Sequence, residues 1–240
     1  MRMRKKKNLE PRMGRCDEWL VSSPEALRGA WRQEFEAPED AQLNLEIGCG
    51  KGSFIVEMAR QNPDQCFIAV ERVESVLLLA MEKAREADLD NLLFIDADAA
   101  KLGEVFAPAE IDRLYLNFSD PWPPKRQHKR RLTHPRLLAV YDSFLKPRGE
   151  ICFKTDNKGL FEDSVCYFSQ YGYGLFEVTF DLHSTDTPNV MTEYERNFSS
   201  KGFPIYRLVA RRMLPGTEMT DVREAYLKEM PGVSVLKNEQ

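Results

Sequence analysis

The amino-acid sequence predicts an α/β fold in which helices cover both faces of a mostly parallel β-sheet. Apolar strand patterns alternate with amphipathic helix patterns from residue 43 to residue 172, and this alternation is typical of parallel strands joined by helical crossovers. The last two strand patterns have only a loop between them, so we expect them to pair antiparallel. With 240 residues, of which 42% are hydrophobic, the chain is long enough to bury a sizeable core.

The hydrophobic period and the positions of proline and glycine predict each element in order. Strands are expected at 43–49, 66–71, 91–97, 111–118, 149–155, 174–182 and 203–211. Helices are expected at 23–35, 53–63, 73–89, 134–147 and 158–172, with a short helix or turn at 101–106. Residues 183–202 are polar and lack a period, which predicts a long loop that is either functional or disordered. We divide the chain into a basic N-terminal extension with a short helix (1–35), a main domain (36–212) and a C-terminal tail (213–240) with a short helix near 219–229.

Two sequence features bear on the compartment. The chain has no apolar run of about 18 residues, so no membrane span is expected, and no apolar segment follows the basic N-terminus as it would in a secretory signal. The cysteines form no C-x-x-C pair and no metal-ligand spacing with the three histidines. We therefore expect reduced thiols, no metal site and a cytoplasmic protein. The five cysteines are Cys16, Cys49, Cys66, Cys152 and Cys166.

The charge distribution predicts a localised site for a polyanion. The formal net charge is −4, yet residues 1–15 hold seven Lys and Arg against one Glu, and residues 125–131 hold five and no acid. Two basic patches on an acidic remainder favour a defined nucleic-acid surface over general adhesion. For the N-terminal run alone, a solvated tail is an equally good interpretation.

A glycine-rich turn closes the first predicted strand. In EIGCGKG (46–52), Gly48, Gly50 and Gly52 allow a sharp turn and a close approach of a ligand to the main chain. The spacing differs from the G-x-G-x-x-G of dinucleotide sites. Glu46 at this edge disfavours a pyrophosphate and favours a cationic or amino-bearing ligand.

Acidic residues also end the next two predicted strands. Glu71 ends the second strand, where a carboxylate can accept hydrogen bonds from the ribose hydroxyls of an adenosine. Asp98 follows the third strand, with Asp96 as the alternative, and a short acid there can meet an adenine amino group. Because the carboxyl ends of parallel strands meet at one edge, these acids predict a site for an adenosine-containing ligand.

This set of residues resembles the class I methyltransferases, which bind S-adenosylmethionine. The resemblance covers about residues 43–155 and implies a seven-stranded sheet with an antiparallel last strand. It also implies S-adenosylmethionine as the methyl donor, with Glu46 near its methionine part, Glu71 at the ribose and Asp98 at the adenine. The implied cofactor-binding residues are Glu46, Gly48, Gly50, Glu71, Asp98 and Asp120.

The segment YLNFSDPWPPKRQHKRR (115–131) lies just beyond the fourth predicted strand. Asp120 therefore faces the expected position of the transferable methyl group, where positioning and electrostatics dominate catalysis. Phe118 and Trp122 offer stacking surfaces for an unpaired base. The basic run that follows is suited to grip the flanking phosphates.

Three motifs together resemble the tRNA (guanine-N7)-methyltransferase family over about residues 8–212. They are NFSDPWP followed by KR and KRRL, then FKTDN (153–157) and MTEYERNF (191–198). The resemblance implies transfer of a methyl group to N7 of the guanosine at position 46 in the tRNA variable loop, with Asp120 as the catalytic carboxylate. It implies RNA or substrate contacts for Lys125, Arg126, Gln127, His128, Lys129, Arg130, Arg131, Asp156, Thr192, Glu193, Tyr194 and Glu195.

The sequence departs from the family motif at Pro124, where a lysine is usual, and at Gln127, where a histidine is usual. We expect Lys125 to replace the missing lysine contact. Of the other candidates, His134 is interpreted as a helix cap, His183 has no partner that the sequence reveals, and Cys49 has no basic neighbour that would activate it.

Two alternatives stay open at this point. One is a class I methyltransferase acting on an exocyclic amino group of RNA, since NFSDPWP loosely echoes the N-P-P-W/Y turn of such enzymes. The other is a non-catalytic RNA-binding protein with the same fold. The oligomeric state, monomer or homodimer, is not determined by the sequence.

Overall fold

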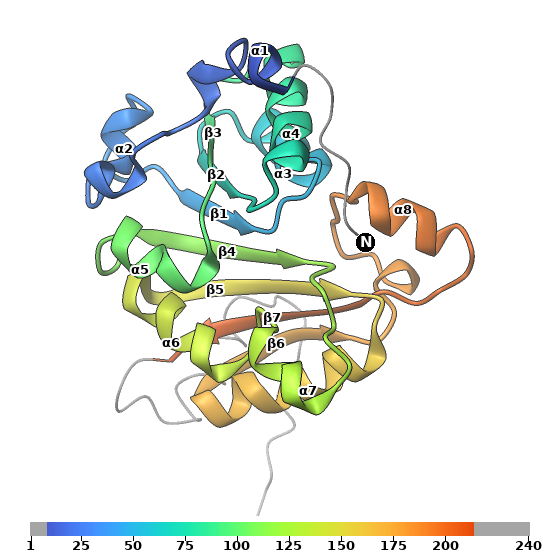
Figure 1. The fold of residues 1–240 in the computed structure, drawn as a ribbon. Coiled ribbons are helices and arrows are strands. Elements are labelled where there is room, and N and C mark those ends of the chain that lie inside the picture. Colours follow the sequence, from blue (N-terminus) through green and yellow to red (C-terminus); the bar gives the residue numbers. More distant parts are fainter. Residues whose placement is uncertain (1–8, 214–240) are drawn as a thin grey trace, which may run out of the picture.

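The centre of the molecule is one seven-stranded β-sheet (Figure 1). The computed structural model describes residues 9–213. The strand order is β3-β2-β1-β4-β5-β7-β6, and β7 runs antiparallel to both of its neighbours while the other pairs are parallel. This confirms the predicted mixed sheet. The strands are β1 (Leu43–Ile47), β2 (Cys66–Val70), β3 (Leu92–Ile95), β4 (Ile111–Asn117), β5 (Leu145–Thr155), β6 (Tyr173–Thr179) and β7 (Tyr206–Arg212).

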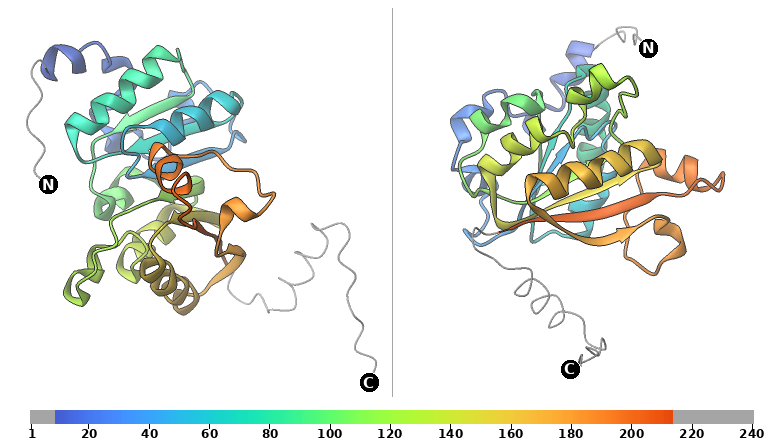
Figure 2. Two further views of the ribbon diagram at one scale, coloured as in Figure 1. Left: turned by 90° about the vertical axis from the view of Figure 1, so that its right-hand side faces the viewer. Right: turned by 90° about the horizontal axis from the view of Figure 1, so that it is seen from below.

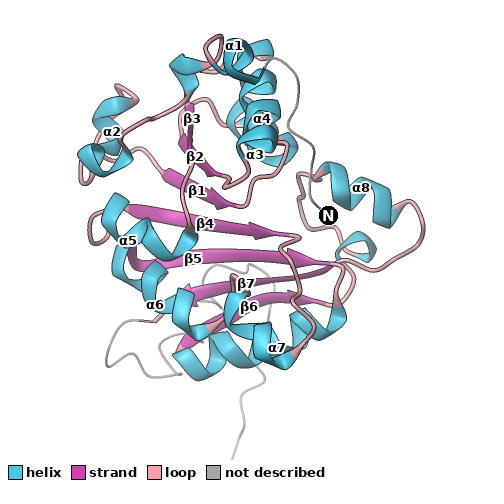
Figure 3. Cartoon of the chain, viewed as in Figure 1, coloured by secondary structure: helices cyan, strands magenta, loops and turns pink. Residues whose placement is uncertain are grey.

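The predicted helices form between the strands and cover the two faces (Figure 3). Helices α5, α6 and α7 pack on one face, and α3 and α4 pack on the other. The α-helices are α1 (Leu9–Met13), α2 (Trp31–Glu34), α3 (Ser53–Gln61), α4 (Glu74–Glu86), α5 (Leu102–Val105), α6 (Pro135–Phe144), α7 (Lys158–Tyr171) and α8 (Glu193–Ser199). Within residues 9–213, no helix is long and apolar enough to cross a membrane.

Alternating side chains on β2 show how the sequence builds both layers. Ile68 and Val70 join the core beneath α5–α7, whereas Phe67 and Ala69 join the core beneath α3 and α4. All four are buried, as expected for a strand covered on both faces. Each large apolar side chain buried in this way contributes roughly 1.5–3 kcal/mol, so the sheet is a rigid support for the residues at its edge.

The strand order reverses direction between β1 and β4. The chain proceeds from β1 outward through β2 to β3 and then returns to β4 on the other side of β1. At such a switch point the connections diverge and leave a crevice at the carboxyl ends of the strands. Figure 2 (left) looks onto this edge, where α8 lies across the sheet.

Residues 9–35 pack against the main sheet and α4. Arg12 pairs with Glu82 of α4, Nε1 of Trp19 donates to the carbonyl of Leu89 at 2.7 Å, and Trp31 is fully buried. The single helix predicted over 23–35 is wrong in detail. It forms as a 3-10 turn and α2, which are separated by Gly29 at φ +85°.

The predicted boundary at residue 36 stays a prediction. Residues 1–8 and the short helix predicted near 219–229 lie outside the described residues.

The structure corrects the prediction that 183–202 lacks regular structure. Helix α8 begins after Thr192, whose hydroxyl accepts a hydrogen bond from the backbone N–H of Glu195 at 2.8 Å. The Glu195 carboxylate in turn accepts from the backbone N–H of Thr192, which completes a capping box. Residues 192–195 have the capping-box signature T-x-x-E, so the sequence contains the signal that predicts the start of this helix.

Candidate functional site

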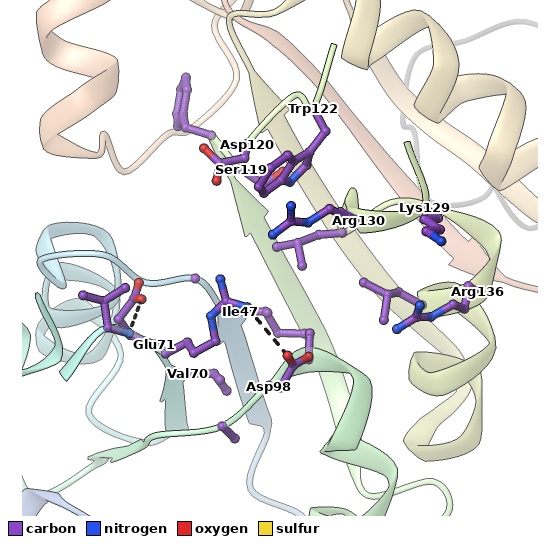
Figure 4. Close-up of a pocket in the computed structure, with 18 residues that line it drawn as sticks. Ile47, Val70, Glu71, Asp98, Ser119, Asp120, Trp122, Lys129, Arg130 and Arg136 are labelled. Atoms are coloured by element: carbon purple, nitrogen blue, oxygen red, sulfur yellow. Dashed lines mark hydrogen bonds and ion pairs between the residues drawn. The ribbon is translucent and has the colours of Figure 1, made fainter. Parts of the chain in front are cut away.

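Two adjoining cavities open at the carboxyl ends of β1, β2 and β4. Their volumes are about 470 Å³ and about 350 Å³, and Gly48 and Phe118 line both. Glu71, Asp98 and Asp120 line the larger cavity, and Glu46 and the start of α8 line the smaller. Figure 4 shows Glu71 and Asp98 on one side of the larger cavity, with Asp120, Trp122 and Arg130 opposite.

The glycine turn after β1 is fixed by its own conformation and by Glu71. Gly48, Gly50 and Gly52 have φ of +77°, +57° and +75°, a region that favours glycine. A Cβ on Gly52 would lie 2.7 Å from the Cβ of Ala80. The Glu71 carboxylate accepts from the backbone N–H of Gly50 at 3.2 Å, so the end of β2 holds the turn in place.

Glu46 is a buried carboxyl group with one unused oxygen. Its Oε1 accepts a hydrogen bond of 2.8 Å from Nδ2 of Asn117, at the end of β4. Its Oε2 is buried and has no hydrogen-bond partner among the described residues. Burial raises the pKa of Glu46 to about 7, although the Asn117 amide and the Lys154 charge act in the opposite direction. A ligand ammonium would supply the missing donor, so the site fits an amino-bearing ligand.

The larger cavity has an acidic edge and apolar walls. Asp98 lines it and Asp96 does not. Asp98 caps the next turn by accepting from the N–H of Ala100 at 2.9 Å, and its other oxygen lies 3.7 Å from Arg72. Ile47 and Val70 contribute to the apolar wall. A flat heterocycle with polar edges fits this combination.

The turn after β4 carries strained backbone. Phe118 and Trp122 have positive φ of +51° and +42°, which is uncommon for bulky residues. Such strain persists where the surroundings hold it, and it clusters at functional sites. Asp120 lies between them, is exposed and faces the larger cavity. The guanidinium of Arg130 stacks 3.7 Å from the centre of the Trp122 ring, so one ring face is covered.

The basic segment divides into exposed and buried residues. Lys125, Arg126, Lys129 and Arg130 are exposed, and Lys129 and Arg130 line the larger cavity. Arg136, at the start of α6, also lines this cavity and was not among the predicted residues. Its isolated position after a proline gave no signal in the sequence.

Arg131 differs from its neighbours because it is only 3% exposed. It pairs with Asp163, donates through Nε to the carbonyl of Pro121 at 2.7 Å and lies 3.0 Å from Nε2 of His128. Arg131 therefore ties the turn that follows Asp120 to α7. Direct contact with a ligand would require these bonds to break.

Residues 192–195 lie beside the smaller cavity, but not all of their side chains reach it. Thr192, Glu193 and Tyr194 line the cavity, and Glu193 pairs with Lys51 of the glycine turn at 2.8 Å. The ring of Tyr194 lies 5.2 Å from that of Phe118. Burial, followed by the carboxylate of Asp156, raises the pKa of Tyr194, so α8 meets the end of β5 here.

Glu195 is fully buried and bonded within the protein. Its carboxylate accepts hydrogen bonds from Lys154 at 2.8 Å and from Asn189 at 2.6 Å. His183 lies 3.1 Å from the same carboxylate, which supplies the partner that the sequence did not reveal.

The structure also bears on His134, on Cys49 and on the expectation of no metal. His134 is the cap of α6, because its Nδ1 accepts from the N–H of Arg136 at 3.2 Å. Cys49 is buried, and burial raises the pKa of its thiol well above the usual value, as expected for an inert cysteine. Within residues 9–213, no cluster of three His, Cys, Asp or Glu side chains could hold a metal, so the expectation of no metal stays a prediction.

The strand order and the crevice at the carboxyl ends of the strands give this chain the fold of the class I methyltransferases. The 16S rRNA methyltransferase KamB superimposes with a TM-score of 0.57 at 15% identity, covering 78% of this chain and 94% of its own. A SAM-dependent methyltransferase from Aquifex aeolicus superimposes with a TM-score of 0.53 at 11% identity, covering 86% and 99%. At these identities the likeness shows the fold alone.

Sequence relatives narrow the assignment. A family profile described as "Putative methyltransferase" matches residues 40–208. The tRNA (guanine-N(7)-)-methyltransferase of Listeria monocytogenes serotype 4b is 48% identical over 88% of this chain and 98% of its own. That of Lachnoclostridium phytofermentans is 48% identical over 82% and 92%. The chain belongs to the tRNA (guanine-N(7)-)-methyltransferase family.

Proposed function

We propose that this protein transfers a methyl group from S-adenosylmethionine to N7 of guanosine in tRNA, at position 46 of the variable loop. The observation that carries the proposal is the meeting of the two cavities at Gly48 and Phe118. The acids suited to the methyl donor and the exposed basic segment thereby face one shared space. A tRNA substrate gives the cytoplasm as the expected site of action.

Five residues are proposed to hold the donor. S-adenosylmethionine supplies an activated methyl group. Glu46 accepts a hydrogen bond from the amino group through its unused Oε2, and Glu71 accepts from the ribose hydroxyls. Asp98 is proposed to accept from the adenine amino group, and Gly48 and Gly50 let the ligand approach the main chain.

Asp120 is proposed as the catalytic carboxylate, bordering both the donor and the guanine. N7 of guanine has a free lone pair, so no proton has to be removed before methyl transfer. The product is a cationic purine, which a carboxylate at this position stabilises as its charge develops. The exposed position of Asp120 at the larger cavity supports this role.

The exposed residues of the basic segment are proposed to contact the tRNA phosphates. Lys125, Arg126, Lys129 and Arg130 present their charges on the surface beside the cavity. Gln127 and His128 are half-buried in the same 3-10 turn, Lys125–Arg130. Pro124 is the residue before this turn, where the family has lysine, and we propose that Lys125 provides the replacement charge.

Asp156, Thr192, Glu193 and Tyr194 are proposed to contact the guanosine itself. Tyr194 is 45% exposed and its ring lies beside that of Phe118, which supports a stacking role. Carboxylates are suited to accept hydrogen bonds from N1–H and the amino group of guanine. Glu195 and Arg131 complete the set by holding these two segments in place, because both are buried.

Product analysis tests the proposal. The protein is incubated with S-adenosylmethionine and unmodified tRNA, and the nucleosides are then identified by mass spectrometry. The expected product is 7-methylguanosine. N6-methyladenosine or another amino-methylated nucleoside would contradict the proposal in favour of the exocyclic-amine alternative, and a folded protein that fails to bind S-adenosylmethionine would favour the non-catalytic one.

A further inference from the structure

Lys154 is a buried cation that the proposed reaction has not used. It lies near the end of β5 and is only 5% exposed. Its Nζ donates to the carboxylate of Glu195 at 2.8 Å, to Oδ1 of Asn189 at 2.9 Å and to the carbonyl of Val190 at 3.0 Å. The three hydrogen bonds therefore end on the loop before α8 and on the first turn of α8 itself.

The Glu195 carboxylate accepts hydrogen bonds from three parts of the chain. It is fully buried, and its donors come from β5 through Lys154, from the loop before α8 through Asn189 and from the cap of α8 through the N–H of Thr192. His183 adds a contact at 3.1 Å. A charged pair this deep is weak evidence for stability, because desolvation offsets much of the attraction. The arrangement of its hydrogen bonds indicates instead that the pair fixes the position of residues 189–195 relative to β5.

The same lysine neighbours the donor site. Lys154 pairs in register with Asn117 of β4, and Asn117 donates to Glu46 at 2.8 Å. The Nζ of Lys154 also lies 5.1 Å from the centre of the Phe54 ring, which lines the smaller cavity together with Glu46. Lys154 is thus placed between the donor site and α8.

We propose that Lys154 is a positioning residue that, through its buried ion pair with Glu195, holds Thr192, Glu193 and Tyr194 against the edge of the donor site. The inference rests on the proposed function, because it assigns these three residues to the guanosine. The three Nζ hydrogen bonds of Lys154 end on protein groups. Lys154 acts by fixing the start of α8, because residues that contact a ligand are held in position by hydrogen bonds from the residues packed behind them.

The first test measures the order of α8 without any reaction. Lys154→Met in the full chain removes the cation, and Lys158→Met is the matched control, since Lys158 is exposed on α7 and 3.7 Å from Glu162. Amide hydrogen exchange over residues 189–199 is expected to be about tenfold faster in Lys154→Met, with β1–β4 unchanged, and normal in Lys158→Met. Wild-type protection of 189–199 in Lys154→Met would overturn the proposal.

A second variant keeps the test decisive if Lys154→Met does not fold. Glu195→Gln keeps the side-chain shape and removes one charge of the pair. Glu195→Gln alone is expected to raise the KM for tRNA about tenfold with a smaller effect on kcat, and a KM equal to that of the wild type would overturn the proposal. Where Lys154→Met folds, it is expected to have the same effect. The KM for tRNA of the double variant Lys154→Met/Glu195→Gln should not exceed that of the more impaired single variant, because both substitutions remove the same contact. A double variant whose KM rises by the product of the two single effects would overturn the ion pair as the cause.

A third readout separates positioning from a general loss of structure. Burial raises the pKa of Glu46, the Asn117 amide and the Lys154 charge lower it, and the Glu71 charge raises it further. The pH midpoint of S-adenosylmethionine binding, measured by calorimetry, should therefore rise in Lys154→Met and stay unchanged in Lys158→Met. An unchanged midpoint in Lys154→Met would contradict the placement of Lys154 beside the donor site. A wild-type protein that makes no 7-methylguanosine would contradict the proposed function instead. The hydrogen-exchange measurement would then still decide whether Lys154 fixes α8.

Discussion

Asn117 donates a 2.8 Å hydrogen bond to one carboxylate oxygen of Glu46, and the other oxygen is buried with no hydrogen-bond partner in residues 9–213. The two residues come from neighbouring parallel strands, β4 and β1, at the point where the strand order reverses. Burial raises the pKa of Glu46 to about 7. The protein therefore holds a poorly solvated acid that is suited to a hydrogen-bond donor from a ligand.

This acid makes the stability of the ligand-free protein depend on pH. The folded pKa of about 7 lies above the reference value of 4.5, so the folded state binds more protons than the unfolded state between these values. The free energy of unfolding should thus fall as pH rises from about 4.5 to about 7, by about 2–3 kcal/mol at most. Urea denaturation at several pH values measures this, and Glu46→Gln should lack this part of the slope. An identical slope in the variant would refute the assignment.

Binding of S-adenosylmethionine should show the opposite trend. Only the ionised Glu46 attracts an ammonium group strongly, so affinity is expected to drop about tenfold between pH 7.5 and pH 6. Isothermal titration calorimetry provides the measurement. Glu46→Gln should bind about 10- to 100-fold more weakly at pH 7.5 and show a flatter profile. Equal affinities of the variant and the wild type would remove Glu46 from the donor site.

Asp120→Ala separates catalysis from folding. The side chain is exposed, so the thermal midpoint should change little. The rate of methyl transfer is expected to fall about 10²- to 10³-fold, because the carboxylate stabilises charge that develops on the guanine. Single-turnover kinetics with saturating tRNA and donor check this, and Asp120→Asn is the matched isosteric variant. Wild-type rates in both variants would assign catalysis elsewhere.

Arg130 and Arg131 are neighbours in sequence with opposite expected effects. Arg130 is exposed, so Arg130→Ala should weaken tRNA binding several-fold and reduce the slope of log affinity against log salt by about 1, with little loss of stability. Arg131 is buried against Asp163 and Pro121, so Arg131→Met should lower the free energy of unfolding by about 1–3 kcal/mol.

Filter binding at several salt concentrations and thermal melting distinguish the two. A large stability loss in Arg130→Ala, with none in Arg131→Met, would reverse the assignment. Lys101→Ala, on the 3-10 turn Ala99–Lys101, serves as a surface control for both measurements.

The sheet and its acidic edge were predictable because they depend on local patterns. Periods of two and of 3.6 residues identified the strands and the helices α3, α4, α6 and α7, and the acids Glu46 and Glu71 come at strand ends that parallel pairing brings to one edge. The sequence also predicted that Gly52 is needed in the turn. The structure agrees, because its positive φ and its contact with Ala80 both exclude a side chain.

Tertiary contacts explain what the sequence could not reveal. The run K-R-R offers no sign that Arg131 turns inward while Arg130 stacks on Trp122, because that choice depends on Asp163 of α7. Likewise, Glu195 reads as a surface acid until β5 brings Lys154 to it from 41 residues away. The positive φ of Trp122, +42°, likewise has no signal in the sequence.

The methyl donor and guanine N7 are proposed to meet beside Asp120. The most direct measurement replaces guanosine 46 of an otherwise unmodified tRNA by 7-deazaguanosine, which carries C–H in place of N7 and keeps the exocyclic amino group. Methyl transfer from labelled S-adenosylmethionine to this tRNA and to its unsubstituted counterpart is then compared. We predict full incorporation into the unsubstituted tRNA and none into the 7-deaza tRNA. Equal incorporation into both would contradict the account.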